Sequence, residues 1–541
     1  MTQTTRPVPA IALSTPGRPP VVESDFNPWW TVLSAALANF ICTVDNQLHS
    51  VNLRYLAGPL GFQLDEGSWA AAAFIATQLV AIVLTGRLVR RLGVRFFLTG
   101  NALLLTLASV VAIAAPNLLV LFVARALAGF AAGSFLAIAL NLVMDQLPVT
   151  KRPIGYLVFG IPSTLAIPVG YFLGGWCIEN ASWHWLYVPA ALGGVLLAGF
   201  FWYRLRSLPS EPPQPWWQVD WPGLVALIVA ACTLATVLQR GTTENWFDSP
   251  FIVTISLLSA FAWGLFGWFE LHSRHAFIDL RLLARRNFAA SQVINAMIGL
   301  VLSYTFVVTS FLTQIHGYNS IQIAEVIVWA ALVNPLMPVL MKKLDMRVLI
   351  ALGLACFVPS CLMNAYLSAN VAGEQLIWSQ VVRALGQPLL IIALLRLAMT
   401  GLKASEYESA AQIFNLVRTA ASSTATAAMG GWLVWREHFH SHAIVENLGQ
   451  SYWQSHLQQL AAALVSRGSE PLAATNQATA LLKQMTSNQA YILAFGDLFW
   501  LLALSMAVIV VALLWVRGSS TVPTLTTVAP PRARPGGGVP G

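Results

Sequence analysis

Fourteen apolar stretches, each close to twenty residues long, restrict the fold of this chain more strongly than any other feature of its sequence. A helix of about 20 apolar residues crosses the roughly 30 Å hydrocarbon core of a bilayer, where every backbone polar group needs an internal partner. We therefore predict an all-α polytopic membrane protein with fourteen transmembrane helices. The predicted spans are residues 29–53, 67–86, 96–115, 117–144, 154–176, 185–203, 221–239, 251–270, 289–314, 321–341, 348–367, 375–401, 409–435 and 491–516.

The composition indicates that lipid covers much of the chain. Hydrophobic residues make up 57% of the 541 residues and charged residues only 10%, against about 25% charged residues in a soluble domain. The net charge of +8 comes from short basic clusters between apolar stretches, which is typical of membrane topology and not of a nucleic-acid-binding face. The sequence has no Gly-Lys-Ser/Thr phosphate-binding motif, so we expect neither an ATP-driven pump nor an enzyme, and no cofactor.

Two features raise the question of a metal site. Alternate histidines occur in residues 436–442, although we interpret this run as an ordinary solvated loop start. The five cysteines lack metal-ligand spacing, so we interpret them as small hydrophobic residues, with a disulfide or a metal site as the alternative. They are Cys42, Cys177, Cys232, Cys356 and Cys361.

The basic residues alternate between successive loops. One set of loops, such as 87–95 and 342–347, is rich in Arg and Lys, whereas opposite short loops such as 115–117 have none. The positive-inside rule then places both ends of the chain in the cytoplasm, with the spans in a bacterial inner membrane. The ends, residues 1–27 and 518–541, are rich in Pro with Thr and Ser or with Gly, and we predict that they are disordered.

Ionisable residues inside the spans are the sharpest functional signal, because each costs a few kcal/mol at the bilayer centre unless it is paired or hydrated. Asp45 lies in the first span and Arg125 in the fourth. We interpret Asp45 as the proton carrier and Arg125 as its partner, with a purely structural buried pair as the alternative. Glu325, in the tenth span, is a further candidate for proton coupling.

An internal repeat surrounds the arginine of the fourth span. Residues 123–127, Val-Ala-Arg-Ala-Leu, resemble residues 381–385, Val-Val-Arg-Ala-Leu, as duplicated halves around a central cavity would, although a chance match is the alternative. We assign His49, Arg383, Asn415 and Arg418 to the substrate cavity. Arginines outnumber acids in the spans, which favours neutral or anionic aromatic compounds over permanent cations.

Two charged residues near span ends and one long loop complete the sequence features that need an explanation. Arg54 and Asp497 lie close to span ends, where snorkelling to the interface explains them. Residues 437–488 form a long hydrophilic outer loop with a helix-like rhythm, which we expect to project into the periplasm. This loop either caps the bundle or provides a docking surface for a partner.

Several of these motifs resemble the fourteen-span drug:proton antiporters of the major facilitator superfamily, of the EmrB/QacA type, from Trp29 to Arg517. Asp45 matches the first-span aspartate of these exporters, and Arg125 matches the arginine of their fourth-span motif. The sequence departs from the family at Val89, Ala128 and Tyr171, which we interpret as the sign of an atypical substrate. The residues that match the conformational motifs are Gly86, Arg90, Arg91, Gly93, Gly129, Gly170, Gly174 and Gly175.

The resemblance implies a major facilitator fold with two pseudo-symmetric six-helix bundles, residues 28–206 and 287–517, joined by two inserted helices in residues 207–286. It also implies proton-coupled efflux of small amphiphilic or aromatic compounds, with a periplasmic membrane-fusion adaptor and an outer-membrane channel bound through residues 437–488. Proton-coupled uptake of a metabolite, or a non-transporting membrane scaffold or receptor, is the alternative.

Overall fold

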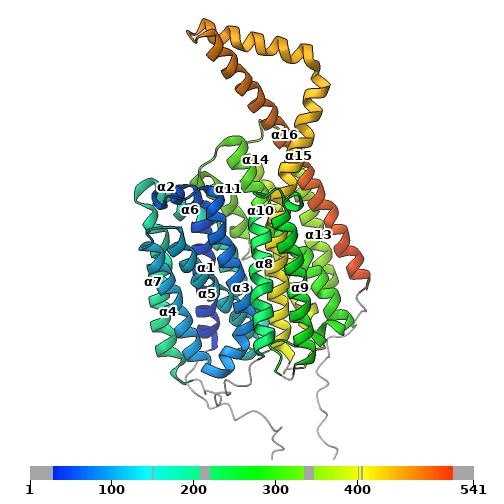
Figure 1. Ribbon diagram of the computed structural model, residues 1–541. Helices are drawn as coiled ribbons and strands as arrows, with labels where there is room; N and C mark the ends of the chain where they lie inside the picture. Colours follow the sequence, from blue (N-terminus) through cyan, green and yellow to red (C-terminus); the bar gives the residue numbers. More distant parts are fainter. Residues whose placement is uncertain are drawn as a thin grey trace, which may run out of the picture.

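The structure, a computed structural model, describes residues 28–148, 151–207, 220–273, 275–333, 346–399, 401–403 and 406–515, which form a bundle of long helices (Figure 1). The helices are α1 (Pro28–Val51), α2 (Leu53–Leu60), α3 (Leu64–Leu92), α4 (Val94–Ile113), α5 (Leu118–Gln146), α6 (Arg152–Asn180), α7 (Val188–Arg204), α8 (Trp221–Arg240), α9 (Pro250–His272), α10 (Arg286–His316), α11 (Ser320–Val333), α13 (Met346–Met363), α14 (Gly373–Met399), α15 (Tyr407–Ser466) and α16 (Pro471–Trp515). Short 3-10 helices include η1 (Trp183–Tyr187) and η5 (Leu280–Ala284).

Each predicted span falls at least in part on one of these helices, the last two on the first part of α15 and the last part of α16. Residues 334–341 of the span predicted at 321–341, and the termini 1–27 and 518–541 predicted to be disordered, lie outside the described residues. Nine helices in the described part of the chain are long and apolar enough to cross a membrane, and two shorter helices, Ser320–Ala331 and Val348–Met363, are also apolar. Large apolar side chains on the outside remain exposed, for example Leu196 at 74% and Leu257 at 68%, as lipid contact requires. The multi-pass α-helical class is confirmed, and the count of fourteen spans stays a prediction.

The helix packing repeats itself along the chain. In the first half, α1 packs on α5 and α6, α3 on α5, and α4 on α5 and α7. In the second half, α10 packs in the same way on α14 and α15, α11 on α14, and α13 on α14 and α16. The correspondence pairs α1 with α10, α4 with α13 and α5 with α14, which is the pseudo-symmetry expected of the fold. The domain boundaries inferred from the sequence stay predictions.

The two halves meet mainly where α6 packs on α11 and where α3 and α5 pack on α15, with a smaller contact between α6 and α14. Helix α8 packs on α9 and on α3 of the first half, and also contacts α15 of the second half. In Figure 1, α8 and α9 stand beside these helices with their axes along the bundle. Helix α8 therefore contacts both halves.

Helices α15 and α16 continue past the bundle as a long helical hairpin (Figure 1). Helix α15 spans 60 residues and bends at Gly449, whose φ of 71° lies in the left-handed region that suits glycine. Residues 437–488, expected as an outer loop, are therefore mostly helical, because they are rich in Ala, Leu and Gln, which favour helix. The expectation that this segment projects from the bundle agrees with the structure.

An ion pair outside the spans links the start of α10 to the start of α15. Arg285 precedes α10 and Glu406 precedes α15, and the guanidinium donates to both carboxylate oxygens, at 2.8 and 2.6 Å. The Arg285 guanidinium, with the Lys403 backbone N–H, holds the pKa of the Glu406 carboxyl below its ordinary value of 4.5. A lowered folded-state pKa means that the pair stabilises the fold above pH 4.5 and loses this effect as the pH falls through the folded value.

We predict that Glu406→Gln lowers the unfolding temperature by at most a few degrees at pH 7, because the pair is exposed and screened by solvent. The difference from the wild type should vanish as the pH falls below 4.5. Thermal unfolding in detergent, followed from pH 3 to pH 7, measures this. Glu446→Gln, at an exposed position of the hairpin, is the matched control. A difference that stays constant over the whole pH range would contradict the assignment.

Candidate functional site

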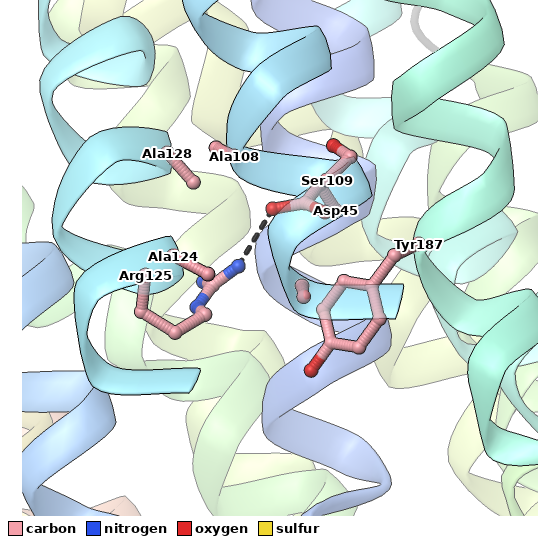
Figure 2. Close-up of a pocket in the computed structure, with 8 residues that line it drawn as sticks. Asp45, Ala108, Ser109, Ala124, Arg125, Ala128 and Tyr187 are labelled. Atoms are coloured by element: carbon pink, nitrogen blue, oxygen red, sulfur yellow. Dashed lines mark hydrogen bonds and ion pairs between the residues drawn. The ribbon is translucent and has the colours of Figure 1, made fainter. Parts of the chain in front are cut away.

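A buried ion pair joins α1 to α5 in the interior of the first half. Asp45 Oδ2 accepts a hydrogen bond of 2.6 Å from the Arg125 guanidinium. The two side chains are 2% and 1% exposed, and Figure 2 shows them pointing toward each other between the helices. The structure thus brings together the two residues that the sequence singles out for proton coupling.

Two more groups hold the Arg125 guanidinium in place. Its second terminal nitrogen donates to Asn46 Oδ1 at 2.8 Å, from the residue next to Asp45 on α1. The guanidinium carbon lies 4.4 Å from the ring centroid of Phe74 on α3, within cation–π range. Removing one partner of such a buried pair costs about 3–5 kcal/mol, because the other charge is left uncompensated. The pair therefore fixes α1, α3 and α5 relative to one another.

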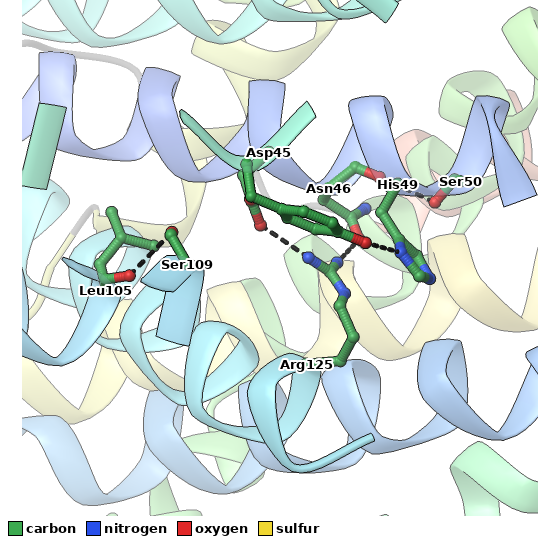
Figure 3. Close-up of polar contacts among 8 residues, drawn as sticks. Asp45, Asn46, His49, Ser50, Leu105, Ser109 and Arg125 are labelled. Carbon is green, nitrogen blue, oxygen red and sulfur yellow. Dashed lines mark hydrogen bonds and ion pairs between the residues drawn. The ribbon is translucent and has the colours of Figure 1, made fainter. Parts of the chain in front are cut away.

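His49 lies one helical turn after Asp45 and belongs to the same polar core. Its Nδ1 is 2.9 Å from the hydroxyl of Tyr187, and its Nε2 is buried without a hydrogen-bond partner (Figure 3). His49 and Tyr187 are each 1% exposed. The sequence analysis missed Tyr187, because no motif marks a tyrosine at the end of η1 as part of a site on α1.

The small pocket beside the ion pair leaves about 150 Å³ of space unfilled by atoms, and none of it is wide enough to hold a water molecule. This volume is below the roughly 300–1,000 Å³ of a typical small-molecule site. In this conformation the ion pair is therefore closely packed, and the space beside it has no room for an aromatic compound. Its lining residues are Asp45, Ala108, Ser109, Ala112, Ala124, Arg125, Ala128 and Tyr187.

Glycines let the helices around this pocket approach closely. A Cβ at Gly129 of α5 would overlap the carbonyl oxygen of Phe74 on α3. A Cβ at Gly170 of α6 would overlap the Gln47 side chain of α1, and one at Gly174 would overlap Asn52, between α1 and α2. One at Gly175 would lie 2.7 Å from Ile321 of α11. Gly175 therefore lies where the two halves meet, whereas the other three glycines pack helices within the first half.

The motif at the end of α3 contacts the start of α15 in the other half. Arg90 forms an ion pair with Glu408. A Cβ at Gly86 would overlap the side chains of Glu408 and Gln412, so glycine leaves room for this contact. Of the other two motif residues, Arg91 is 9% exposed, and Gly93 has a φ of 80° between α3 and α4.

The second half contains a buried arginine in neutral surroundings. Arg383 of α14 is 4% exposed and donates to Gln380 Oε1 at 3.2 Å and to Gln387 Oε1 at 2.7 Å. On α15, Arg418 donates to Asn415 Oδ1 at 3.2 Å, and Asn415 is 1% exposed. The two predicted cavity arginines thus make three hydrogen bonds to amide oxygens, on α14 and α15, and no hydrogen bond in the described part of the chain joins them to His49.

Two acidic residues lie elsewhere than the sequence suggests. Glu325 is on an exposed face of α11 and has no ion pair within the described chain, so the structure does not bring it to Asp45; its role in proton coupling stays a prediction. The snorkelling interpretation of Asp497 is wrong. Its Oδ2 accepts hydrogen bonds of 2.7 Å from both Arg436 and His440, because α15 and α16 pack side by side at the base of the hairpin.

The metal and disulfide alternatives find no support in the structure. The five cysteines are free, and the described residues hold no group of three or more His, Cys, Asp or Glu side chains that could bind a metal. The histidine run of residues 436–442 lies inside α15. Arg54, also interpreted as snorkelling, is exposed at α2, and this interpretation stays a prediction.

Two repeated halves, an inserted helix pair and a buried ion pair define a multi-pass α-helical membrane protein built on internal pseudo-symmetry. Residues 35–426 match the model of the Major Facilitator Superfamily. The chain belongs to this superfamily. A solved structure of a proton-dependent oligopeptide transporter has a similar fold, with a TM-score of 0.57 and 13% identity over 90% of this chain and 99% of that chain. A bacterial homologue of the human lysosomal transporter Spinster is also similar, with a TM-score of 0.51 and 13% identity over 91% of this chain and 99% of that chain.

Curated relatives are similar over nearly the whole chain. The fatty acid resistance protein FarB of Neisseria gonorrhoeae is 24% identical over 492 residues, 90% of this chain and 95% of FarB. The multidrug export protein EmrB of Haemophilus influenzae is 26% identical over 485 residues, 87% of this chain and 92% of EmrB. EmrB of Escherichia coli is 24% identical over 490 residues, 89% of this chain and 94% of that protein.

We predict that Gly129→Ala destabilises the protein by about 1–3 kcal/mol, because the added methyl group forces α5 away from the Phe74 backbone. The change should appear as a lower unfolding temperature of the purified protein. Gly100→Ala on α4 is the matched control, since a Cβ there meets nothing within 4 Å. An unfolding temperature of Gly129→Ala equal to that of Gly100→Ala would contradict the close packing.

Proposed function

We propose that this protein exports small amphiphilic or aromatic compounds across a bacterial inner membrane in exchange for protons. The buried Asp45–Arg125 pair is the observation that carries the proposal, since a titratable carboxyl inside the bundle couples a proton to helix packing. Relatives named multidrug export protein EmrB, and one named colistin resistance protein EmrB, support the direction of transport and a part in antibiotic resistance.

In this mechanism Asp45 is the proton carrier and Arg125 its partner. A proton on Asp45 removes the charge that attracts Arg125, while Asn46 and Phe74 still hold the guanidinium. Helices α1 and α5 then lose their strongest mutual contact and can repack. Glu325, on the exposed face of α11, is a second candidate for proton exchange at the contact between the halves.

The two halves would rock about a central cavity near the middle of the bilayer. The Arg90–Glu408 pair would hold them together at the end opposite the hairpin, and the close contact of Gly175 with Ile321 would do so between α6 and α11. His49, Arg383, Asn415 and Arg418 would contact the substrate in the cavity. The surplus of arginines favours neutral or anionic aromatic compounds.

The hairpin of α15 and α16 suggests a partner in the periplasm. With both chain ends in the cytoplasm, residues 437–488 would project outward from the inner membrane (Figure 1). The protein would then work with a membrane-fusion adaptor and an outer-membrane channel. This assignment is supported by the exposed apolar side chains along the hairpin, among them Leu472 at 73% and Met485 at 62%.

We predict that Asp45→Asn abolishes efflux driven by a pH gradient, because asparagine cannot exchange the proton. The measurement is substrate transport in proteoliposomes with and without the gradient. The variant also leaves Arg125 buried and unpaired, at a cost of about 3–5 kcal/mol. Its folding must therefore be measured in parallel by thermal unfolding.

The double variant Asp45→Asn with Arg125→Gln separates coupling from stability. It removes both charges and keeps the side chains similar in size, so it should unfold at a higher temperature than Asp45→Asn alone. We expect that it still fails to couple efflux to the gradient. Gradient-driven efflux at the wild-type rate in either variant would show that the pair is purely structural.

A further inference from the structure

The second half contains a counterpart of the Asp45–Arg125 pair. Arg383 on α14 corresponds to Arg125 on α5, and α10 corresponds to α1. Where Arg125 meets a carboxylate on α1, Arg383 meets the ring of Tyr304 on α10, with the guanidinium carbon 5.2 Å from the ring centroid. The two halves thus share a buried arginine but differ in the group that faces it.

Arg383 has no acidic partner. Its hydrogen bonds go to the amide oxygens of Gln380 and Gln387, and none of the ion pairs among the described residues includes it. The Tyr304 hydroxyl is already engaged, with Ser360 Oγ at 2.9 Å and Asn364 Nδ2 at 2.8 Å. A buried guanidinium without a counter-ion is costly inside a membrane protein and marks a functional site.

The surroundings of Arg383 contain an unused hydrogen-bond donor. Gln380 Nε2 is buried without a partner, while the oxygen of the same amide accepts from Arg383. The amide cannot be turned around to correct this, because its NH₂ group would then face the guanidinium. Gln380 therefore presents a buried donor without an acceptor beside a cation without a counter-ion, and an anion would supply both the acceptor and the charge.

Such an anion would reach Arg383 from the side on which Gln387 lies. Gln387 is only partly buried, and its oxygen covers the terminal nitrogen of Arg383 that it contacts. Aromatic rings lie behind the arginine, because Tyr304 packs edge-on against Phe357 and Phe499 at centroid distances of 5.7 and 5.3 Å. The rings support the guanidinium from behind, so that the carboxylate of an acid can meet it from the Gln387 side.

We propose that Arg383 binds the carboxylate of an aromatic substrate, and that the Gln387 amide oxygen occupies the carboxylate position in this conformation. Gln380 Nε2 donates a further hydrogen bond to the bound carboxylate. Tyr304 holds the guanidinium from its other face. This assignment rests on the proposed export function, because the anion is the exported compound.

Gln387→Glu tests the proposal, since it places a carboxylate of the same shape beside Arg383. Binding of 1-naphthoate and of its neutral analogue 1-naphthamide to the purified full-length protein is measured by titration calorimetry. We expect the Kd for 1-naphthoate to rise at least about tenfold, which corresponds to about 1.4 kcal/mol. The Kd for 1-naphthamide should change less than about twofold, within the tolerance of such measurements. The variant should also unfold at a higher temperature, because it gains an ion pair.

Two further variants complete the test. Gln314→Glu, at an exposed position of α10, adds the same charge to the same half and should leave both Kd values unchanged. Arg383→Lys keeps the charge but loses the forked geometry, so it should weaken 1-naphthoate binding less than Arg383→Gln does. Wild-type affinity for 1-naphthoate in Gln387→Glu or in Arg383→Gln would overturn the proposal, as would preference of the wild type for 1-naphthamide.

The export function and the anion site can fail separately. If gradient-driven efflux of other compounds persists but 1-naphthoate binding does not depend on Arg383, the anion site alone is overturned. Binding of 1-naphthoate that depends on Arg383, in a protein that shows no gradient-driven efflux, would overturn the export function and leave Arg383 as an anion-binding residue.

Discussion

The contact between Asp45 and Arg125 constrains the rest of the first half. Two charges in an apolar bundle are tolerated only when they meet at hydrogen-bond distance, as they do at 2.6 Å. This requirement fixes the distance and rotation of α1 relative to α5. Asn46 and Phe74 complete the surroundings of the guanidinium, and Gly129 allows α3 to come close enough for Phe74 to do so.

The contacts between the halves set the limits of any movement. Arg90 and Glu408 connect α3 to α15, while Asn319 Nδ2 donates to Glu179 Oε1 at 3.1 Å and connects the start of α11 to the end of α6. The two halves are thus bridged by side chains both between α3 and α15 and between α6 and α11. Rocking toward either side of the membrane must break one bridge and can keep the other, which gives two alternative conformations in place of a continuous opening.

The sequence predicts the helices well because a membrane span is a local property of about 20 residues. It also predicts the Asp45–Arg125 pair, since buried charges must find partners. It does not predict how each helix is rotated about its axis, because these helices are apolar on every side and lack a clear amphipathic face. The exposed position of Glu325 could therefore not be predicted from the sequence. Nor could the parts that Tyr187, Gln380 and Gln387 play in the buried polar contacts. Asp497 was misjudged because its partners belong to an extension of α15 that resembles a loop in composition.

The difference between the two halves gives the pseudo-symmetry a functional meaning. Arg125 and Arg383 occupy corresponding helices, and only Arg125 has its own carboxylate. In the first half a proton can cancel that carboxylate, whereas in the second half only an external anion can neutralise the arginine. Proton and anion would therefore act on separate helix pairs that are joined through α3, α15, α6 and α11. Under the proposed function, such an arrangement would couple proton and anion through the contact between the halves and would not require them to compete for one residue.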